Sequence, residues 1–142
     1  MEKLKIFGAD THSSVELPFA DEGVRAGFPS PAQNGMDNSI DLNRDLVRHP
    51  ESTFYARVEG DSMVDAGVRA GDILMIDKSL EPDDGDMAVC VVNGEFTLKF
   101  VERHPDCVVL VPANSDYEPI RVGEGERFEV WGVVTYVIHK IK

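Results

Sequence analysis

Apolar residues are distributed unevenly along this 142-residue chain. They are sparse before Phe54, and from Thr53 onward they come in dense, short runs. A single domain usually holds about 100–200 residues, so the length fits one domain. The pattern therefore predicts one compact core, preceded by a leading segment that contributes little to it.

The runs after residue 52 have the length and the residue types of β-strands. We predict strands at Thr53–Val58, Asp72–Ile76, Met87–Val92, Glu95–Glu102, Cys107–Val111, roughly Tyr117–Val122, and Phe128–Ile138. Asn93-Gly94 lies between two of these runs and is the strongest two-residue hairpin signal, because both turn positions need positive φ. A short helix is predicted over Asp41–His49, with Asp41 as N-cap and Pro50 as the stop. The fold class is therefore mostly β with one short helix.

Residues 1–40 are predicted to form an extended, accessible arm. Pro18, Pro29 and Pro31 each remove a backbone donor and restrict the residue before them, and no periodicity is sustained across this segment. Such a stretch buries too little surface to offset the entropy lost on ordering it. A long structural loop is the alternative, but loops of that length are uncommon in compact domains. The expected organisation is an arm over 1–40 and a body over 41–142.

The net charge of −12 is spread along the chain, which has no cluster of Lys and Arg. Proteins that bind duplex DNA neutralise phosphates with such clusters, so we expect no tight direct contact with nucleic acid. No apolar stretch is long enough to cross a membrane, and the first ten residues lack the apolar block of a signal peptide; both indicate a cytoplasmic protein. Cys90 and Cys107 lie in apolar runs, as reduced core cysteines do, and the four histidines have no ligand spacing. No metal or cofactor is expected.

Two residues carry candidate chemistry, Ser62 in the turn EGDSM and Lys99 in the strand EFTLKFV. On a strand, Lys99 shares a face with Thr97 and Val101. A lysine amine can activate a serine hydroxyl only when it is uncharged, and burial in an apolar strand favours the uncharged form. The backbone N–H groups of Asp61 and Ser62 are candidate donors to the oxyanion. For an isolated strand lysine, a cation on an edge strand facing water is the alternative.

Six segments of the chain resemble the UmuD family. They are GFPSPA at 27–32, IDLN at 40–43, GDSMVDAGVRAGDILMID at 60–77, GEFTLK at 94–99, P-x-N-S-x-Y-x-P-I at 112–120 and VWGVVTYVI at 130–138. The wider group includes LexA-like repressors and signal peptidases. The resemblance implies a LexA-like, S24-type peptidase body, found as a homodimer, with Ser62 as nucleophile and Lys99 as the neutral base.

The resemblance also implies that the substrate is the protein's own arm, cut between Ala26 and Gly27. Ala26 has a small side chain and Gly27 lets the backbone approach closely. The same dipeptide recurs at 66–67 and 70–71, within the expected body, so accessibility must select the bond in the arm.

The resemblance further implies the role of an SOS-response protein in DNA repair and mutagenesis. A RecA–single-stranded DNA filament would promote the cut, and the trimmed dimer would act as accessory subunit of a UmuC-type, Y-family translesion polymerase (polymerase V). A LexA-like repressor would need a helix-turn-helix domain before the arm, and a signal peptidase would need a membrane anchor. The remaining alternative is a polymerase- or regulator-binding module in which the Ser62–Lys99 pair is vestigial.

Overall fold

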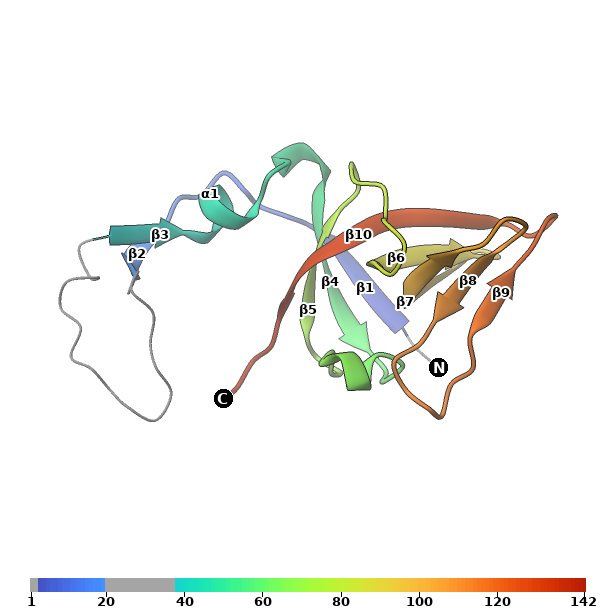
Figure 1. Ribbon diagram of the computed structural model, residues 1–142. Coiled ribbons are helices and arrows are strands. Elements are labelled where there is room, and N and C mark those ends of the chain that lie inside the picture. The colour runs from blue at the N-terminus through green and yellow to red at the C-terminus, as the bar shows by residue number, and fades with distance from the viewer. Residues whose placement is uncertain (1–2, 20–37) are drawn as a thin grey trace. The chain divides into compact units, whose positions relative to one another are not determined.

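The computed structural model describes residues 3–19 and 38–142 (Figure 1). Contacts divide the chain into two compact units, one made of Met1–Ala9 with Glu51–Lys142 and the other of Asp10–Pro50. We call them the sheet unit and the small unit. The sheet unit contains an eight-stranded sheet in the order β1-β4-β5-β10-β6-β7-β8-β9, with every neighbouring pair antiparallel. Its strands are β1 (Lys3–Gly8), β4 (Thr53–Glu59), β5 (Ile73–Asp77), β6 (Met87–Val92), β7 (Glu95–Arg103), β8 (Val108–Val111), β9 (Ile120–Val122) and β10 (Phe128–Ile138).

The mostly β prediction is confirmed, and β6 and β10 have the predicted bounds. The other predicted strands differ at their ends by one to three residues, the largest change being at β9, which begins at Ile120 instead of Tyr117. The hairpin prediction is also confirmed. Asn93 and Gly94 have φ values of 50° and 86°, and β6 pairs with β7 from Val92↔Glu95 onward.

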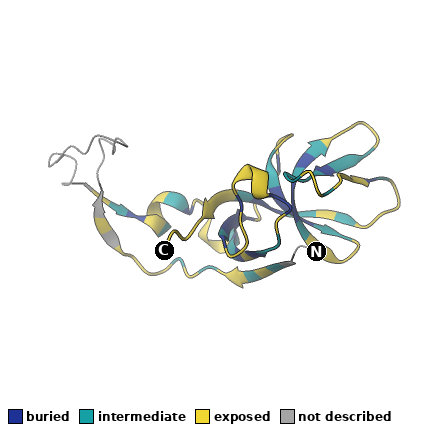
Figure 2. Cartoon of the chain, turned by 90° about the horizontal axis from the view of Figure 1, so that it is seen from below, coloured by how far each residue is buried: buried dark blue, intermediate teal, exposed yellow. Residues whose placement is uncertain are grey.

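The core of the sheet unit consists of two clusters of buried side chains. The first contains Ala56, Val58, Met63, Val68, Leu74, Ile76, Val89 and Leu98. The second contains Ala88, Cys90, Val101, Leu110 and Val122. Figure 2 shows the buried residues in dark blue along the strands, with most exposed residues in the turns. Because successive strand residues point to opposite faces, β6 and β7 contribute to both clusters.

Strand β10 joins the two parts of the sheet because it pairs with β5 along one stretch and with β6 along another. Its register shifts between Val130 and Gly132 and again between Val134 and Tyr136, as at β-bulges. A Cβ on Gly132 would lie 2.5 Å from Ile76 Cγ2 and 3.3 Å from the Asp77 carbonyl oxygen. Glycine therefore permits β10 to approach β5 closely at this point.

The small unit contains β2 (Glu16–Phe19), β3 (Asn38–Asp41) and the helix α1 (Leu42–Leu46). Asp41 is the N-cap, as predicted, and its Oδ1 accepts a hydrogen bond of 3.0 Å from Asn43 N. The helix ends at Leu46, three residues before the predicted end, because Val47 takes an extended conformation (φ −90°, ψ 106°). Of the described helices, none combines the length with the hydropathy that crossing a bilayer demands.

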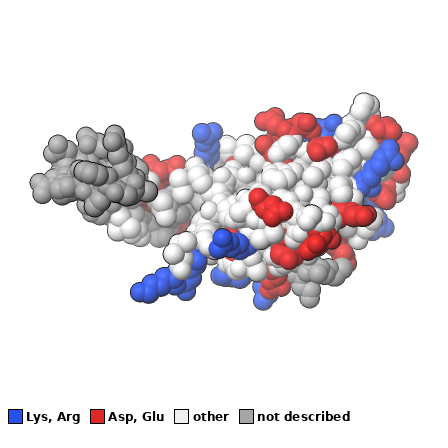
Figure 3. Space-filling model, turned by 60° about the horizontal axis from the view of Figure 1, so that its bottom comes forward, with Lys and Arg blue, Asp and Glu red and all other residues white. Residues whose placement is uncertain are grey.

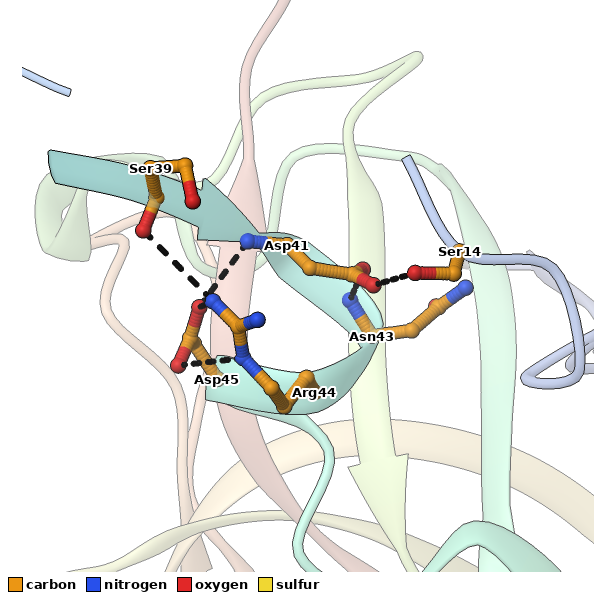
Figure 4. A network of polar contacts seen from close by, with 6 residues as sticks. All are labelled: Ser14, Ser39, Asp41, Asn43, Arg44 and Asp45. Atoms are coloured by element: carbon orange, nitrogen blue, oxygen red, sulfur yellow. Dashed lines mark hydrogen bonds and ion pairs between the residues drawn. The ribbon is translucent and has the colours of Figure 1, made fainter. Parts of the chain in front are cut away.

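Polar contacts hold this unit together around Asp41 (Figure 4). Ser14 Oγ donates to Asp41 Oδ2 at 2.6 Å, and this bond is the main reason why the pKa of Asp41 lies below its usual value. The Arg44 guanidinium lies 3.0 Å from Asp45 Oδ2 and lowers the pKa of that carboxyl.

The structure divides the chain differently from the predicted arm (1–40) and body (41–142). Residues 3–8 are strand β1 of the sheet unit, and residues 10–50 form the small unit. The physical reason is the alternation K-L-K-I, which places Leu4 and Ile6 together against the first core cluster. That the segment carries a cleavage site stays a prediction, since Ala26 and Gly27 lie outside the described residues.

Candidate active site

Ser62 lies in the turn that follows β4. Gly60 has a φ of 119°, which favours glycine, and Val64 N donates to the Asp61 carbonyl oxygen at 3.2 Å to close the turn. The turn leads into the short 3-10 helix η3 (Val64–Ala66). Met63, the next residue, belongs to the first core cluster, and Ser62 is only 1% exposed. The serine is therefore held on a short, tightly bonded segment and shielded from bulk water.

Lys99 lies on β7, and its amine reaches the same place. Nζ donates to Ser62 Oγ at 3.1 Å. It also donates to Thr97 Oγ1 at 2.7 Å and to the Leu98 carbonyl oxygen at 3.0 Å. Thr97 shares the face of Lys99, as the strand alternation predicted. The side chains of Ser62 and Lys99, separated by 36 residues in the sequence, are thus in direct contact.

The alternative of a water-facing lysine on an edge strand is wrong for Lys99. Strand β7 lies between β6 and β8, so it is not an edge, and Lys99 is 4% exposed. Burial of an amine is unfavourable unless its polar hydrogens are bonded or its charge is lost. The three acceptors provide hydrogen bonds for the buried amine. A site that is shielded from water and lies next to a hydroxyl also suits activation of that hydroxyl as a nucleophile.

A loop between β8 and β9 braces the Ser62 turn. Ala113 N donates to the Ser62 carbonyl oxygen at 2.8 Å. Asn114 Nδ2 donates to the Asp61 carbonyl oxygen at 2.9 Å, and Tyr117 OH donates to Asp61 Oδ1 at 2.7 Å. Asn114 and Tyr117 belong to the motif P-x-N-S-x-Y-x-P-I, which by itself assigned them no role. The spacing of Asn114 and Tyr117 was the available signal, but nothing in it indicated contact with residues more than fifty positions away.

A cavity of about 520 Å³ opens beside the amine. Its lining includes Lys99, Thr97, Phe96, Tyr117 and Ile120. The lining is mixed, since Phe96 and Ile120 are apolar whereas Lys99, Thr97 and Tyr117 carry polar groups. The site thus offers a buried hydroxyl, an adjacent amine and space for a peptide.

The burial around Lys99 also affects a cysteine on the neighbouring strand. Desolvation by burial raises the pKa of the Cys90 thiol to about 12. Cys90 and Cys107 are both free thiols. Cys90 is fully buried, whereas Cys107 is partly exposed.

The remaining predicted site residues differ in what can be said of them. Asp61 and Ser62 both lie in the turn, and their role as oxyanion donors stays a prediction. Ala26 and Gly27 lie outside the described residues. The other two Ala-Gly bonds lie in the sheet unit, where Gly67 N donates to the Val64 carbonyl oxygen and Gly71 N to that of Val58. Their backbones are held by hydrogen bonds, which disfavours them as substrates.

The chain is similar to one known protein family and to several known proteins. Residues 18–135 match the family described as peptidase S24-like. The chain is 38% identical to protein MucA of Salmonella typhimurium over 137 residues, which is 94% of this chain and 92% of MucA. It is 40% identical to protein ImpA of Escherichia coli over 130 residues, which is 92% of this chain and 88% of ImpA. It is also 37% identical to LexA repressor 1 of Geobacter sulfurreducens over 118 residues, which cover 82% of this chain and 57% of the repressor.

Proposed function

The chain belongs to the peptidase S24-like family, and on that premise we propose that it is a self-cleaving serine peptidase of the UmuD type. Its similarity to MucA and ImpA over most of both chains confirms the UmuD-like resemblance expected from the motifs. The observation that carries the proposal is the 3.1 Å distance from Lys99 Nζ to Ser62 Oγ, between side chains on residues that are 4% and 1% exposed.

In the proposed reaction Lys99 is neutral, with its two N–H groups bonded to Thr97 Oγ1 and the Leu98 carbonyl oxygen. Its lone pair accepts the hydroxyl proton of Ser62 while Oγ attacks the carbonyl carbon of Ala26. The backbone N–H groups of Asp61 and Ser62 stabilise the oxyanion. The bond to Gly27 breaks, Lys99 returns the proton to the leaving amine, and the Ala26 acyl group remains as an ester on Ser62. Water then hydrolyses this ester with the same amine as base, which restores the serine.

Thr97 acts as a positioning residue in this scheme. Its hydroxyl and the Leu98 carbonyl oxygen are fixed by strand β7, and both accept hydrogen bonds from the amine. These two contacts limit the rotation of a long, flexible side chain, so the amine is directed at Ser62 before the peptide arrives. The brace from Asn114 and Tyr117 does the same for the serine turn.

The proposed regulation follows from the resemblance to UmuD. A RecA–single-stranded DNA filament promotes the cut by binding preferentially to the conformer in which Ala26-Gly27 lies over Ser62. The trimmed homodimer then serves, in the cytoplasm, as accessory subunit of a UmuC-type translesion polymerase during the SOS response. The protein reaches DNA through that polymerase, since its net charge of −12 opposes direct phosphate contact.

Incubation of the full-length protein across a pH series tests the peptidase activity. Raising the pH favours a neutral amine, so the rate of release of a fragment ending at Ala26 should rise with pH, as measured by mass spectrometry. Ser62→Ala should abolish release, whereas Ser115→Ala, at an exposed serine, should leave it unchanged. Absence of any fragment, with and without a RecA–single-stranded DNA filament, would favour the alternative of a docking module with a vestigial pair.

A further inference from the structure

Strand β1 covers what would otherwise be an open edge of the sheet. It pairs antiparallel with β4 from Lys3↔Glu59 to Gly8↔Phe54, and β4 pairs with β5 on its other side. No described strand lies beyond β1 in the sheet order. Residues 3–8 therefore occupy main-chain donors and acceptors of β4 that would otherwise be free to pair with another strand.

The direction of the β4 main-chain groups can be assigned from its contacts with the following segment. Val58 N donates to the Asp72 carbonyl oxygen at 2.9 Å, and Gly71 N donates to the Val58 carbonyl oxygen at 2.8 Å. The N–H and C=O groups of Val58 thus point away from β1. In an antiparallel ladder this direction alternates, so the N–H and C=O groups of Tyr55 and Arg57 face β1.

Side chains of β1 contact both faces of the sheet. Leu4 and Ile6 pack against the first core cluster. On the opposite face Phe7, 49% exposed, lines an apolar groove of about 340 Å³ with Tyr55, Ile73 and Ile138. Removal of β1 would uncover apolar surface on both faces as well as the edge itself.

The covalent connection from β1 to β4 runs only through residues 9–52, which include the proposed cut. We propose that the edge of β4 is a strand-addition site for an extended segment of a partner protein, and that β1 blocks this edge until cleavage at Ala26-Gly27. The inference rests on the proposed function for its trigger. Before the cut, β1 binds intramolecularly, so its pairing with β4 is favoured over the binding of a strand from a separate molecule.

After the cut, residues 1–26 are held by non-covalent contacts alone. Among the described residues, these contacts include, besides β1, the four-residue pairing of β2 with β3 and the hydrogen bonds from Ser14 to Asp41 and from Asn43 Nδ2 to the Ser13 carbonyl oxygen. A two-stranded ribbon of that length is marginal by itself. The fragment therefore dissociates on dilution, and a competing strand can take its place.

The chemistry of the partner strand follows from the strand it replaces. It needs apolar residues at two alternate positions for the contacts of Leu4 and Ile6, and a basic residue between them. Lys5 Nζ lies 3.8 Å from Glu59 Oε1. The net charge is −12, and acidic side chains form several groups on the face seen in Figure 3. A basic, amphipathic extended segment is thus favoured over an acidic one.

A labelled peptide with the sequence of residues 1–9 (MEKLKIFGA) is the probe, and fluorescence anisotropy measures its binding. The self-cleaved protein, freed of its fragment by dilution and gel filtration, should bind the probe at least tenfold more tightly than uncut Ser62→Ala protein. N-methylation of the probe at Lys5 removes an N–H that faces β4 and should abolish binding. N-methylation at Ile6, whose N–H faces away, should leave binding unchanged.

A third protein separates this inference from the proposed function. It carries Ser62→Ala together with the recognition sequence of an added protease within residues 20–37, so it is cut without the Ser62–Lys99 pair. Probe binding to this protein would support the strand-addition site even if self-cleavage failed. Three results would overturn the inference: equal binding to cut and uncut protein, equal binding of both N-methylated probes, or a fragment that stays bound on dilution. Dissociation of a trimmed dimer by the probe would also overturn it, because the edge would then belong to a second copy.

Discussion

Replacing the buried amine is the sharpest test of why Lys99 lies where it does. Lys99→Met keeps an unbranched apolar side chain and removes the amine. If the amine serves catalysis, cleavage should disappear while the fold remains as stable as before. If it serves the fold, stability should fall. The substitution therefore separates two roles that a Ser62→Ala variant cannot separate.

The structure gives the size of the expected stability change. The variant loses hydrogen bonds to Ser62, Thr97 and Leu98, each worth about 0.5–1.5 kcal/mol net, or about 3 kcal/mol together. Against this, it no longer buries a polar amine, and taking a neutral polar group out of water costs about 2–7 kcal/mol before its new hydrogen bonds are counted. The two terms are of similar size, so the free energy of unfolding should change by less than about 1.5 kcal/mol.

Urea unfolding followed by the fluorescence of Trp131, the chain's one tryptophan, measures this change. Trp131 packs edge-on against Phe54 in the sheet unit, so its emission reports on the fold. Release of the fragment should slow by at least the ~10²–10⁴-fold contributed by a general base. Lys140→Met, at an exposed lysine, is the control and should change neither quantity. A loss of more than about 3 kcal/mol, or cleavage at the wild-type rate, would refute the reasoning.

Three further predictions concern the surroundings of the site. Thr97→Val should slow cleavage about tenfold, by loss of one hydrogen bond, and Thr97→Ser should restore the rate in the same mass-spectrometric assay. Gly132→Ala should lower the free energy of unfolding by about 1–3 kcal/mol because its Cβ would overlap Ile76, whereas Gly123→Ala, with open space around it, should not. Because the pKa of Cys90 is raised to about 12 in the folded protein from 9.0 in the unfolded chain, ionisation favours the unfolded chain and stability should fall as pH rises from about 9. Cys90→Ala should flatten this decline by up to ~1.4 kcal/mol per pH unit, and an unchanged slope in urea unfolding would contradict the assignment.

The sequence predicted best those features that depend on neighbouring residues. Asn93-Gly94 specified its hairpin because both residues tolerate positive φ, and the apolar runs on either side could pair only with each other at that spacing. Asp41 was recognised as a cap because its carboxylate acts within two residues. The helix was predicted too long, because propensity carried it past Leu46 to a proline, whereas the buried Val47 extends the chain instead.

Features that join distant residues were predicted only where chemistry or resemblance connected them. Ser62 and Lys99 were paired because a weak nucleophile needs a base, and their contact is observed. Strand β1 was missed because its partner β4 lies about fifty residues away and its few apolar residues precede a polar, proline-containing stretch. The brace from Asn114 and Tyr117 was missed for the same reason: each side chain contacts a turn more than fifty positions away, and no local pattern connects the two segments.

The two-residue turn at Asn93-Gly94 has a consequence for how the protein can evolve. The length of the turn fixes which residue of β7 occupies the position that faces Ser62. Because side chains alternate between the two faces of a strand, a register shift by one residue moves each side chain to the opposite face. One residue inserted after Gly94 would direct a hydrocarbon side chain at the serine and send the amine into the opposite layer. Changes of length in this loop are therefore tolerable only in pairs, even though the loop itself touches no reacting atom.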